Sequence, residues 1–326
     1  MSHFDLKDAA LRSYRPDIFV PDDFDAFWTR TLAENPAREP RFELIDNRLR
    51  QIDTYDVTFA GYALSPVKGW LHVPAGARGK LPVVVQYIGY SGGRGLPHEQ
   101  TLWATAGYAL FVMDTRGQGS GNRTGHTPDP DGAGEPAPNG YMTRGILSPE
   151  GYYYRRVYTD AVRAIDAALA HPLVDPEQVA VIGGSQGGGL SIAAAGLHRG
   201  VKYALVDVPF LCDFRRAVSL TDRDPYAEIV RYVKTHRDHL ETVFKTLSYF
   251  DGAVLGRRAT AEALFSVGLM DDICPPSTVY AAYNWYGSGA GTEVRKAITE
   301  YPFNGHEGGQ AHLERDQLEW LGQRFS

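Results

Sequence analysis

The chain has 326 residues, with 33 lysines and arginines against 39 aspartates and glutamates, so its formal net charge is −6 at neutral pH. Hydrophobic residues make up 43% of the sequence and charged residues 22%, which is typical of a globular protein and excludes a disordered or fibrous chain. The acidic balance disfavours a nucleic-acid partner, because such a partner would require a clustered basic surface. The length allows one large domain or two small ones.

The cysteine content and the N-terminal sequence indicate the cellular compartment in which the protein is expected. Two cysteines, Cys212 and Cys274, are too few for a disulfide framework, so we expect free thiols in a reducing compartment. No Cys/His cluster has zinc-binding spacing, and we expect neither a metal nor a cofactor. Residues 1–8 lack the pattern of a signal peptide, and no apolar run approaches the roughly 18 residues of a membrane span. These features predict a cytoplasmic protein without a membrane partner.

The first 50 residues are polar and contain several prolines, and they predict an N-terminal arm that packs against a larger body. A helix is expected near residues 22–33, because apolar residues recur there at i, i+3 and i+4. Alternation of apolar and polar residues over 55–59 and 69–73 then predicts an antiparallel pair of strands.

Short continuous apolar runs follow, and such runs indicate strands that are buried on both faces, as in a parallel sheet covered by helices. These runs lie at residues 82–87, 109–113, 179–182, 204–208 and 264–267. Helical stretches separate several of them, notably residues 158–169. The alternation predicts an α/β fold with a mostly parallel central sheet flanked by helices.

Two segments interrupt this alternation. Residues 119–150 form the longest irregular stretch, and a loop of that length is usually functional or disordered. Residues 209–255 contain amphipathic helical pieces, which either roof an active site or add ordinary packing. Because no repeat or linker divides the chain, we expect one domain over residues 1–326, with the N-terminal arm at 1–50.

The strongest local signal is the sequence GGSQG at residues 183–187, between the predicted strand 179–182 and an alanine-rich helix at 190–197. In this strand–turn–helix context, G-x-S-x-G is a nucleophile elbow, whose sharp turn exposes the serine hydroxyl. The helix start behind Ser185 supplies backbone N–H groups and partial positive charge for an oxyanion. We predict that Ser185 is a catalytic nucleophile, and the alternative is a tightly packed structural turn.

A serine nucleophile needs a base, and the base needs an acid that orients it; in this fold the order is Ser, Asp or Glu, then His. Asp271 and Asp272 follow one predicted strand, and His306 follows the next, at residues 296–301. We predict His306 as the base and Asp271 as the acid, with Asp272 as the alternative, because only one of two adjacent side chains can face the imidazole. The histidines at positions 236 and 239 lie on predicted helices and are weaker candidates.

The second oxyanion donor in this fold usually comes from the loop after an early strand. Here residues 86–95 contain four glycines, and Tyr90 could donate its backbone N–H while its ring walls the pocket. The alternative is a glycine-rich surface turn with a packed tyrosine. Pro209 is a second candidate wall. Arg116 follows another strand, and we expect it to brace neighbouring loops by bidentate hydrogen bonds without touching substrate.

Together these motifs resemble the signature of carbohydrate esterase family seven, the acetyl xylan esterases and cephalosporin-C deacetylases. The motifs are RGQ at 116–118, GGSQG at 183–187 and HE at 306–307, and the similarity extends over nearly the whole chain. The resemblance implies the α/β-hydrolase fold. It also implies a serine esterase that removes acetyl groups from small esters, including acetylated xylo-oligosaccharides and cephalosporin C, through an acetyl-enzyme.

The same resemblance implies the triad Ser185, Asp271 and His306, with the backbone N–H groups of Tyr90 and Gln186 as oxyanion donors. Members of the family typically assemble as doughnut-like hexamers whose active sites face an internal cavity, and the stretch 119–150 resembles the loop that builds those contacts. Two other functions stay open: a serine peptidase of the prolyl-oligopeptidase kind, and a non-catalytic ligand-binding member of the fold.

Overall fold

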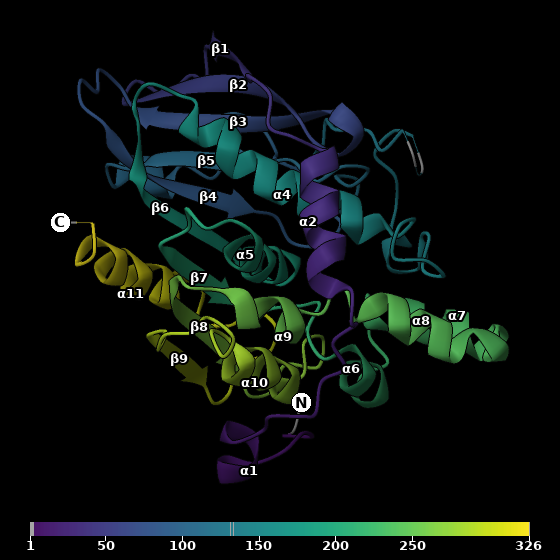
Figure 1. Ribbon diagram of the computed structural model, residues 1–326. Helices are drawn as coiled ribbons and strands as arrows, with labels where there is room; N and C mark the ends of the chain where they lie inside the picture. The colour runs from purple at the N-terminus through teal and green to yellow at the C-terminus, as the bar shows by residue number, and fades with distance from the viewer. Residues whose placement is uncertain (1–2, 131, 133, 326) are drawn as a thin grey trace.

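A computed structural model describes residues 3–130, 132 and 134–325 (Figure 1). Positions 131 and 133 of the predicted loop, and residues 1–2 of the N-terminal arm, therefore lie outside the described residues. The strands are β1 (Arg41–Ile45), β2 (Ile52–Ala60), β3 (Pro66–Pro74), β4 (Leu81–Tyr87), β5 (Ala109–Met113), β6 (Val174–Gly184), β7 (Tyr203–Asp207), β8 (Glu262–Gly268) and β9 (Lys296–Tyr301).

The helices follow the same chain order. The α-helices are α1 (Asp8–Arg12), α2 (Phe24–Glu34), α3 (Leu102–Thr105), α4 (Tyr153–Leu169), α5 (Gln186–Leu197), α6 (Phe214–Leu220), α7 (Tyr226–Thr235), α8 (Leu240–Leu247), α9 (Gly252–Leu255), α10 (Pro276–Trp285) and α11 (Gln310–Gly322). Short 3₁₀ helices lie at Tyr62–Leu64, Tyr141–Thr143, Arg237–His239 and Gly256–Arg258. In the described part of the chain, no helix is both long enough and apolar enough to cross a bilayer.

The strands of the described residues form one nine-stranded sheet in the order β1-β2-β3-β5-β4-β6-β7-β8-β9. The pairs β1–β2, β2–β3 and β3–β5 are antiparallel, and every pair from β5 to β9 is parallel. The predicted antiparallel pair and the mostly parallel sheet are both confirmed. Since parallel strands end at one edge, the loops after β4, β6, β8 and β9 meet there, where ligands bind in open α/β sheets.

Helices cover both faces of the sheet (Figure 1). On β4, Val83 and Val85 belong to the core beneath α4 and α5, whereas Val84 belongs to the core beneath α3 and α11, which contribute Trp103 and Leu321. Successive strand residues face opposite sides, so a strand covered on both faces must be apolar throughout. This burial explains why continuous apolar runs marked the central strands in the sequence.

The N-terminal arm packs against the body, as predicted. The Trp28 ring of α2 stacks on Tyr158 of α4, and its Nε1 donates to the backbone carbonyl of Tyr249 at 3.0 Å. Nearer the N-terminus, Trp285 Nε1 of α10 donates to the carbonyl of Pro16 at 2.9 Å. The arm therefore connects the central helices with the helical segment that precedes β8.

Arg116, just after β5, is fully buried. Its Nε and Nη2 donate to the two carboxylate oxygens of Asp160 on α4 at 2.5 and 2.8 Å. Its Nη1 lies 3.5 Å from Asp129, which also accepts two hydrogen bonds from Arg156. The expected bidentate bracing is confirmed, and it joins the loop after β5 to α4.

We expect Arg116→Met to lower the free energy of unfolding by about 3–5 kcal/mol, because the carboxylate of Asp160 would stay buried without its main partner. The midpoint of urea unfolding, followed by circular dichroism, measures this loss. Arg315→Met is the control, since Arg315 pairs with its exposed neighbour Asp316 and its loss should barely move the midpoint. Equal midpoints for the two variants would contradict the bracing role.

Candidate active site

The chain passes from β6 into α5 through a sharp turn at Ser185, whose φ of 56° and ψ of −120° are rare for a residue with a side chain. A Cβ at Gly183 would lie 2.4 Å from the carbonyl carbon of Gly187, and a Cβ at Gly187 would lie 2.3 Å from the carbonyl oxygen of Tyr87. Both glycines are therefore required by close backbone approach. The turn places Ser185 at the N-terminal end of α5, as the elbow motif predicted.

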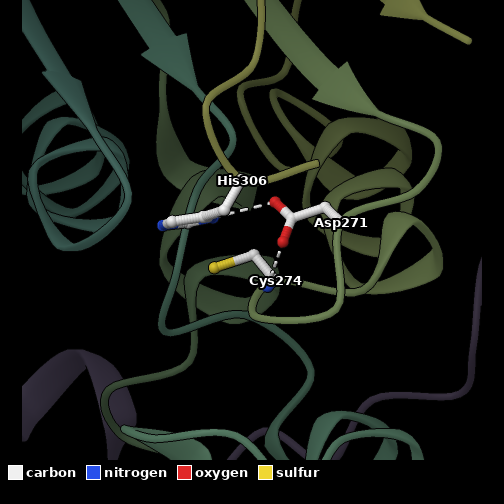
Figure 2. Close-up of side chains that lie close together, drawn as sticks. All are labelled: Asp271, Cys274 and His306. Carbon is white, nitrogen blue, oxygen red and sulfur yellow. Dashed lines mark hydrogen bonds and ion pairs between the residues drawn. The ribbon is translucent and has the colours of Figure 1, made fainter. Parts of the chain in front are cut away.

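Asp271 and His306 come together from the loops after β8 and β9 (Figure 2). His306 Nδ1 lies 2.8 Å from Asp271 Oδ2. The Asp271 carboxylate is fully buried, and its other oxygen accepts the backbone N–H groups of Ile273 and Cys274, both at 2.9 Å. Because the carboxylate can only accept, the proton of a neutral imidazole lies on Nδ1, and Nε2 is left as a base.

Asp272 does not reach the imidazole. Its carboxylate is 28% exposed and lies 3.9 Å from Arg223 Nε, so of the two adjacent acids only Asp271 contacts His306. The histidines at positions 236 and 239 stack on each other, with ring centroids 5.2 Å apart, in the segment that joins α7 to α8.

Ser185 and His306 line one cavity of about 310 Å³. Among the described residues, no hydrogen bond joins the Ser185 hydroxyl to the imidazole, whose Nδ1 faces Asp271. Catalytic hydrogen bonds are often long in an enzyme without substrate and form when the substrate binds.

The Cys274 thiol lies beside the Asp271–His306 pair (Figure 2). One donor atom from each of Asp271, Cys274 and His306 lies within 4.8 Å of the other two, a spacing that a metal ion could bridge. Burial, however, raises the pKa of the thiol well above its usual value, whereas metals bind the thiolate, and both oxygens of Asp271 already accept hydrogen bonds. The donor set fits a hydrogen-bonded Asp–His pair beside a neutral thiol better than a metal centre. Both cysteines are free and buried, which confirms the expected free thiols.

The loop after β4 lies against the elbow. Gly89 approaches the carbonyl oxygen of Gly184, and the side-chain amide of Gln186 donates to the carbonyl of Ile88 at 3.1 Å. Within the described part of the chain, the backbone N–H groups of Tyr90 and Gln186 donate to no protein acceptor. Both groups are therefore available to an oxygen atom bound next to Ser185.

Contacts from two segments hold the Tyr90 side chain. Its hydroxyl donates to Glu228 on α7 at 2.7 Å and accepts the backbone N–H of Tyr141 at 3.0 Å. Its ring packs edge-to-face on Phe210, at 6.1 Å between centroids. Burial raises the pKa of Tyr90, so its hydroxyl remains protonated.

The 310 Å³ cavity is bounded chiefly by the loops after β7 and β9 and by the start of α11. Its lining residues are Gly184, Ser185, Asp207, Val208, Ser266, His306, Glu307, Gly308, Gly309, Gln310, Leu313 and Glu314. Tyr90 and Pro209 are not among them, although Pro209 lies close to the start of α5, at 3.1 Å from where a Cβ on Gly188 would stand. Their roles as pocket walls stay predictions.

Asp207 lines the same cavity, and burial raises the pKa of its carboxyl from 3.8 to about 7, while Gln317 Nε2 donates to it at 2.7 Å. The folded protein therefore holds this proton more tightly than the unfolded chain does. The resulting stabilisation is complete below about pH 4 and is lost as the pH rises through about 7.

Asp207→Asn removes this titration and keeps an acceptor for Gln317. We expect the free energy of unfolding of the variant, minus that of the wild type, to rise by on the order of 3 kcal/mol between about pH 4 and 7. Urea unfolding at several pH values measures the difference, with the exposed Asp316→Asn as control. A difference for Asp207→Asn that stays constant over this range would contradict the prediction.

Comparison with known proteins identifies the family. A family model described as acetyl xylan esterase (AXE1) matches residues 1–324. Among curated proteins, the acetyl esterase Axe7A of Xylanibacter ruminicola is 30% identical over 282 residues. That alignment covers 83% of this chain and 61% of the relative, so the chain spans less than two thirds of the relative's length.

Solved structures agree with this match. The acetyl xylan esterase from Paenibacillus sp. R4 has a TM-score of 0.89 at 39% identity, covering 98% of this chain and 99% of its own. Acetyl xylan esterase 1 from Thermoanaerobacterium sp. JW/SL YS485 has a TM-score of 0.88 at 31% identity, covering 99% and 100%. An acylaminoacyl peptidase from Pyrococcus horikoshii, at 16% identity and a TM-score of 0.60, shares the α/β-hydrolase fold alone. The predicted fold and family are confirmed, and the chain belongs to the acetyl xylan esterase (AXE1) family, a family of carboxylic ester hydrolases.

Proposed function

We propose that this chain is a serine esterase that removes acetyl groups from small esters through an acetyl-enzyme intermediate. The observation that carries the proposal is the 2.8 Å hydrogen bond between His306 and buried Asp271, next to the strained turn that presents Ser185. Membership of the acetyl xylan esterase family supports the acetyl group as the one removed.

In the first step, the Ser185 oxygen attacks the acetyl carbon while His306 Nε2 takes the serine proton. Asp271 stabilises the imidazolium that results. The backbone N–H groups of Tyr90 and Gln186 bind the negative oxygen of the tetrahedral intermediate. The C–O bond to the alcohol then breaks, and His306 returns the proton to the leaving alcohol. In the second step, water attacks the acetyl-enzyme by the same route, which releases acetate and restores Ser185.

The substrates we propose are acetylated xylo-oligosaccharides and cephalosporin C. The sequence resemblance to carbohydrate esterase family seven supports both, and two similar solved proteins are named as acetyl xylan esterases. The cavity of about 310 Å³ at Ser185 and His306 suits a small ester.

A series of para-nitrophenyl esters tests this function. We expect kcat/KM to be highest for the acetate and to fall by about tenfold or more towards the octanoate, because a pocket that fits acetyl excludes a long acyl chain. Acetate release from acetylated xylo-oligosaccharides and from cephalosporin C tests the two natural-type substrates. A flat series, or a preference for octanoate, would contradict an acetyl esterase.

The same assays separate the two alternatives. A serine peptidase would cleave a peptide anilide faster than the acetyl ester. A non-catalytic binding protein would hydrolyse neither, and an organophosphate would not label its Ser185.

We further propose a homohexamer in the cytoplasm, in which residues 119–150 supply contacts between subunits and residues 209–255 form the helical insertion of a single domain. The sequence resemblance supports the hexamer, and two free, buried cysteines fit a reducing compartment. Light scattering should give a mass near six times that of one chain. The mass of a monomer would exclude the hexamer.

A further inference from the structure

Two buried glutamines, Gln118 and Gln186, form a reciprocal pair beside the elbow. Gln118 Nε2 donates to Gln186 Oε1 at 2.8 Å, and Gln186 Nε2 donates to Gln118 Oε1 at 3.2 Å. Both residues are 0% exposed. Gln118 ends the RGQ motif after β5, and Gln186 is the first residue of α5, so the pair joins two segments that are distant in the sequence.

The pair also holds the loop that carries Tyr90. Gln186 Nε2 donates to the carbonyl of Ile88 at 3.1 Å, and the backbone N–H of Ser91 donates to Gln118 Oε1 at 2.8 Å. These two groups belong to the peptide units immediately before and after the unit that contains the Tyr90 N–H. The direction of that N–H is therefore fixed from both sides.

Two tyrosines at the start of α4 complete the network. Gln118 Nε2 donates to the Tyr153 hydroxyl at 3.0 Å, and the Tyr154 hydroxyl donates to Gln186 Oε1 at 2.9 Å. Each side-chain amide thus makes four hydrogen bonds, which is the full capacity of its two donors and two acceptor sites. A buried network in which every donor and acceptor is hydrogen-bonded favours a single arrangement of its side chains.

We propose that Gln118 is a positioning residue for the oxyanion hole. Through the Gln186 side chain and the Ser91 N–H, it sets the separation between the two backbone donors, the N–H groups of Tyr90 and Gln186. The proposal rests on the esterase function proposed above. An oxyanion hole works only when its donors lie about 2.7–3.1 Å from the developing negative oxygen. A small shift of the loop therefore weakens transition-state binding much more than substrate binding.

The first test is Gln118→Leu, which removes the amide and keeps a side chain of similar bulk. We expect kcat for para-nitrophenyl acetate to fall about 100-fold, as on loss of one oxyanion donor, while KM changes by less than about threefold. Affinity for a trifluoromethyl ketone, whose adduct with serine is an oxyanion, should fall in parallel. Complete labelling with a fluorophosphonate counts the folded active sites, so kcat is expressed per intact site.

Gln100→Leu is the matched control. Gln100 also belongs to an amide pair, accepting from Gln86 Nε2 at 2.9 Å, and it donates to the carbonyl of Arg94. Its side chain hydrogen-bonds neither the 88–91 loop nor the elbow. We expect its kcat per site to stay within about twofold of the wild type.

Gln118→Glu provides a second readout that a merely structural role would not move. When the new carboxyl is ionised, one oxygen still accepts the backbone N–H of Ser91. The other oxygen takes the place of the Gln118 NH₂ group, so it cannot donate a hydrogen bond to Gln186 Oε1. Protonation restores a donor, and burial raises the pKa of such a carboxyl into a measurable range. The ratio of the kcat/KM of this variant to that of the wild type should therefore rise as the pH falls. This variant also carries the test where the leucine variant does not fold.

The proposal is overturned if Gln118→Leu keeps the wild-type kcat per labelled active site and the wild-type affinity for the ketone. It is also overturned if the ratio of the kcat/KM of Gln118→Glu to that of the wild type does not change with pH. Failure of the proposed function looks different, because the wild type itself would then hydrolyse no acetyl ester in the same assay.

Discussion

Ser185→Ala should lower kcat for para-nitrophenyl acetate by about 10⁵–10⁶-fold, because members of a catalytic triad act as a unit and only binding and the oxyanion hole would remain. The neighbouring Cys274 cannot replace the serine. Burial raises the pKa of its thiol well above the usual value, and the nucleophilic form of cysteine is the thiolate. Steady-state kinetics on enzyme free of wild-type contamination measures the loss.

Ser191→Ala is the control for this prediction. Ser191 also lies on α5, is buried, and donates its hydroxyl to the carbonyl of Gly187 at 2.9 Å, away from the Asp–His pair. Its kcat should stay within about fivefold of the wild type. Near-normal turnover by Ser185→Ala, or organophosphate labelling at another residue, would exclude Ser185 as the nucleophile.

Asp271→Asn should reduce kcat by about 10⁴-fold with little change in KM. The reason lies in the contacts of the carboxylate. One oxygen accepts the N–H groups of Ile273 and Cys274, so the asparagine would keep its carbonyl oxygen there and turn its NH₂ towards His306. An NH₂ facing Nδ1 favours the tautomer that carries its proton on Nε2, and that tautomer cannot accept the serine proton.

Asp272→Asn provides a matched control one residue away. Its carboxylate faces Arg223 and partly faces solvent, so kcat should stay within about threefold of the wild type. If the two variants lost activity equally, the assignment of Asp271 as the acid would be wrong.

Much of the fold could be predicted because buried strands need continuous apolar runs; the strand predicted at 296–301 is β9 itself. Strand β1 and helix α10 lack the sequence pattern expected for their type of secondary structure. The edge strand β1 (Arg41–Ile45) is largely exposed and carries no buried run. Helix α10 (Pro276–Trp285) is buried over consecutive residues, so its sequence lacks the apolar stripe of a surface helix.

In the candidate site, too, some features could be predicted from the sequence and others could not. The positions of Ser185, Asp271 and His306 could be predicted because strand order fixes where the loops of an α/β sheet meet. The contacts of Gln118 could not, since they come from the loop after β4 and from the starts of α4 and α5, three regions with no common sequence pattern. The RGQ motif contains Gln118, but a three-residue motif does not indicate which distant groups a buried side-chain amide contacts.

The Glu228 carboxylate on α7 accepts the Tyr90 hydroxyl at 2.7 Å through one oxygen, and the backbone N–H of Met142 at 3.0 Å through the other. One acidic side chain thus links the helical segment before β8, the long loop after β5 and a proposed oxyanion donor. Exchanging residues 209–255 between relatives to redesign substrate range would therefore also disturb the catalytic centre. An active chimaera must therefore keep both Glu228 and Tyr90, so that their hydrogen bond can form.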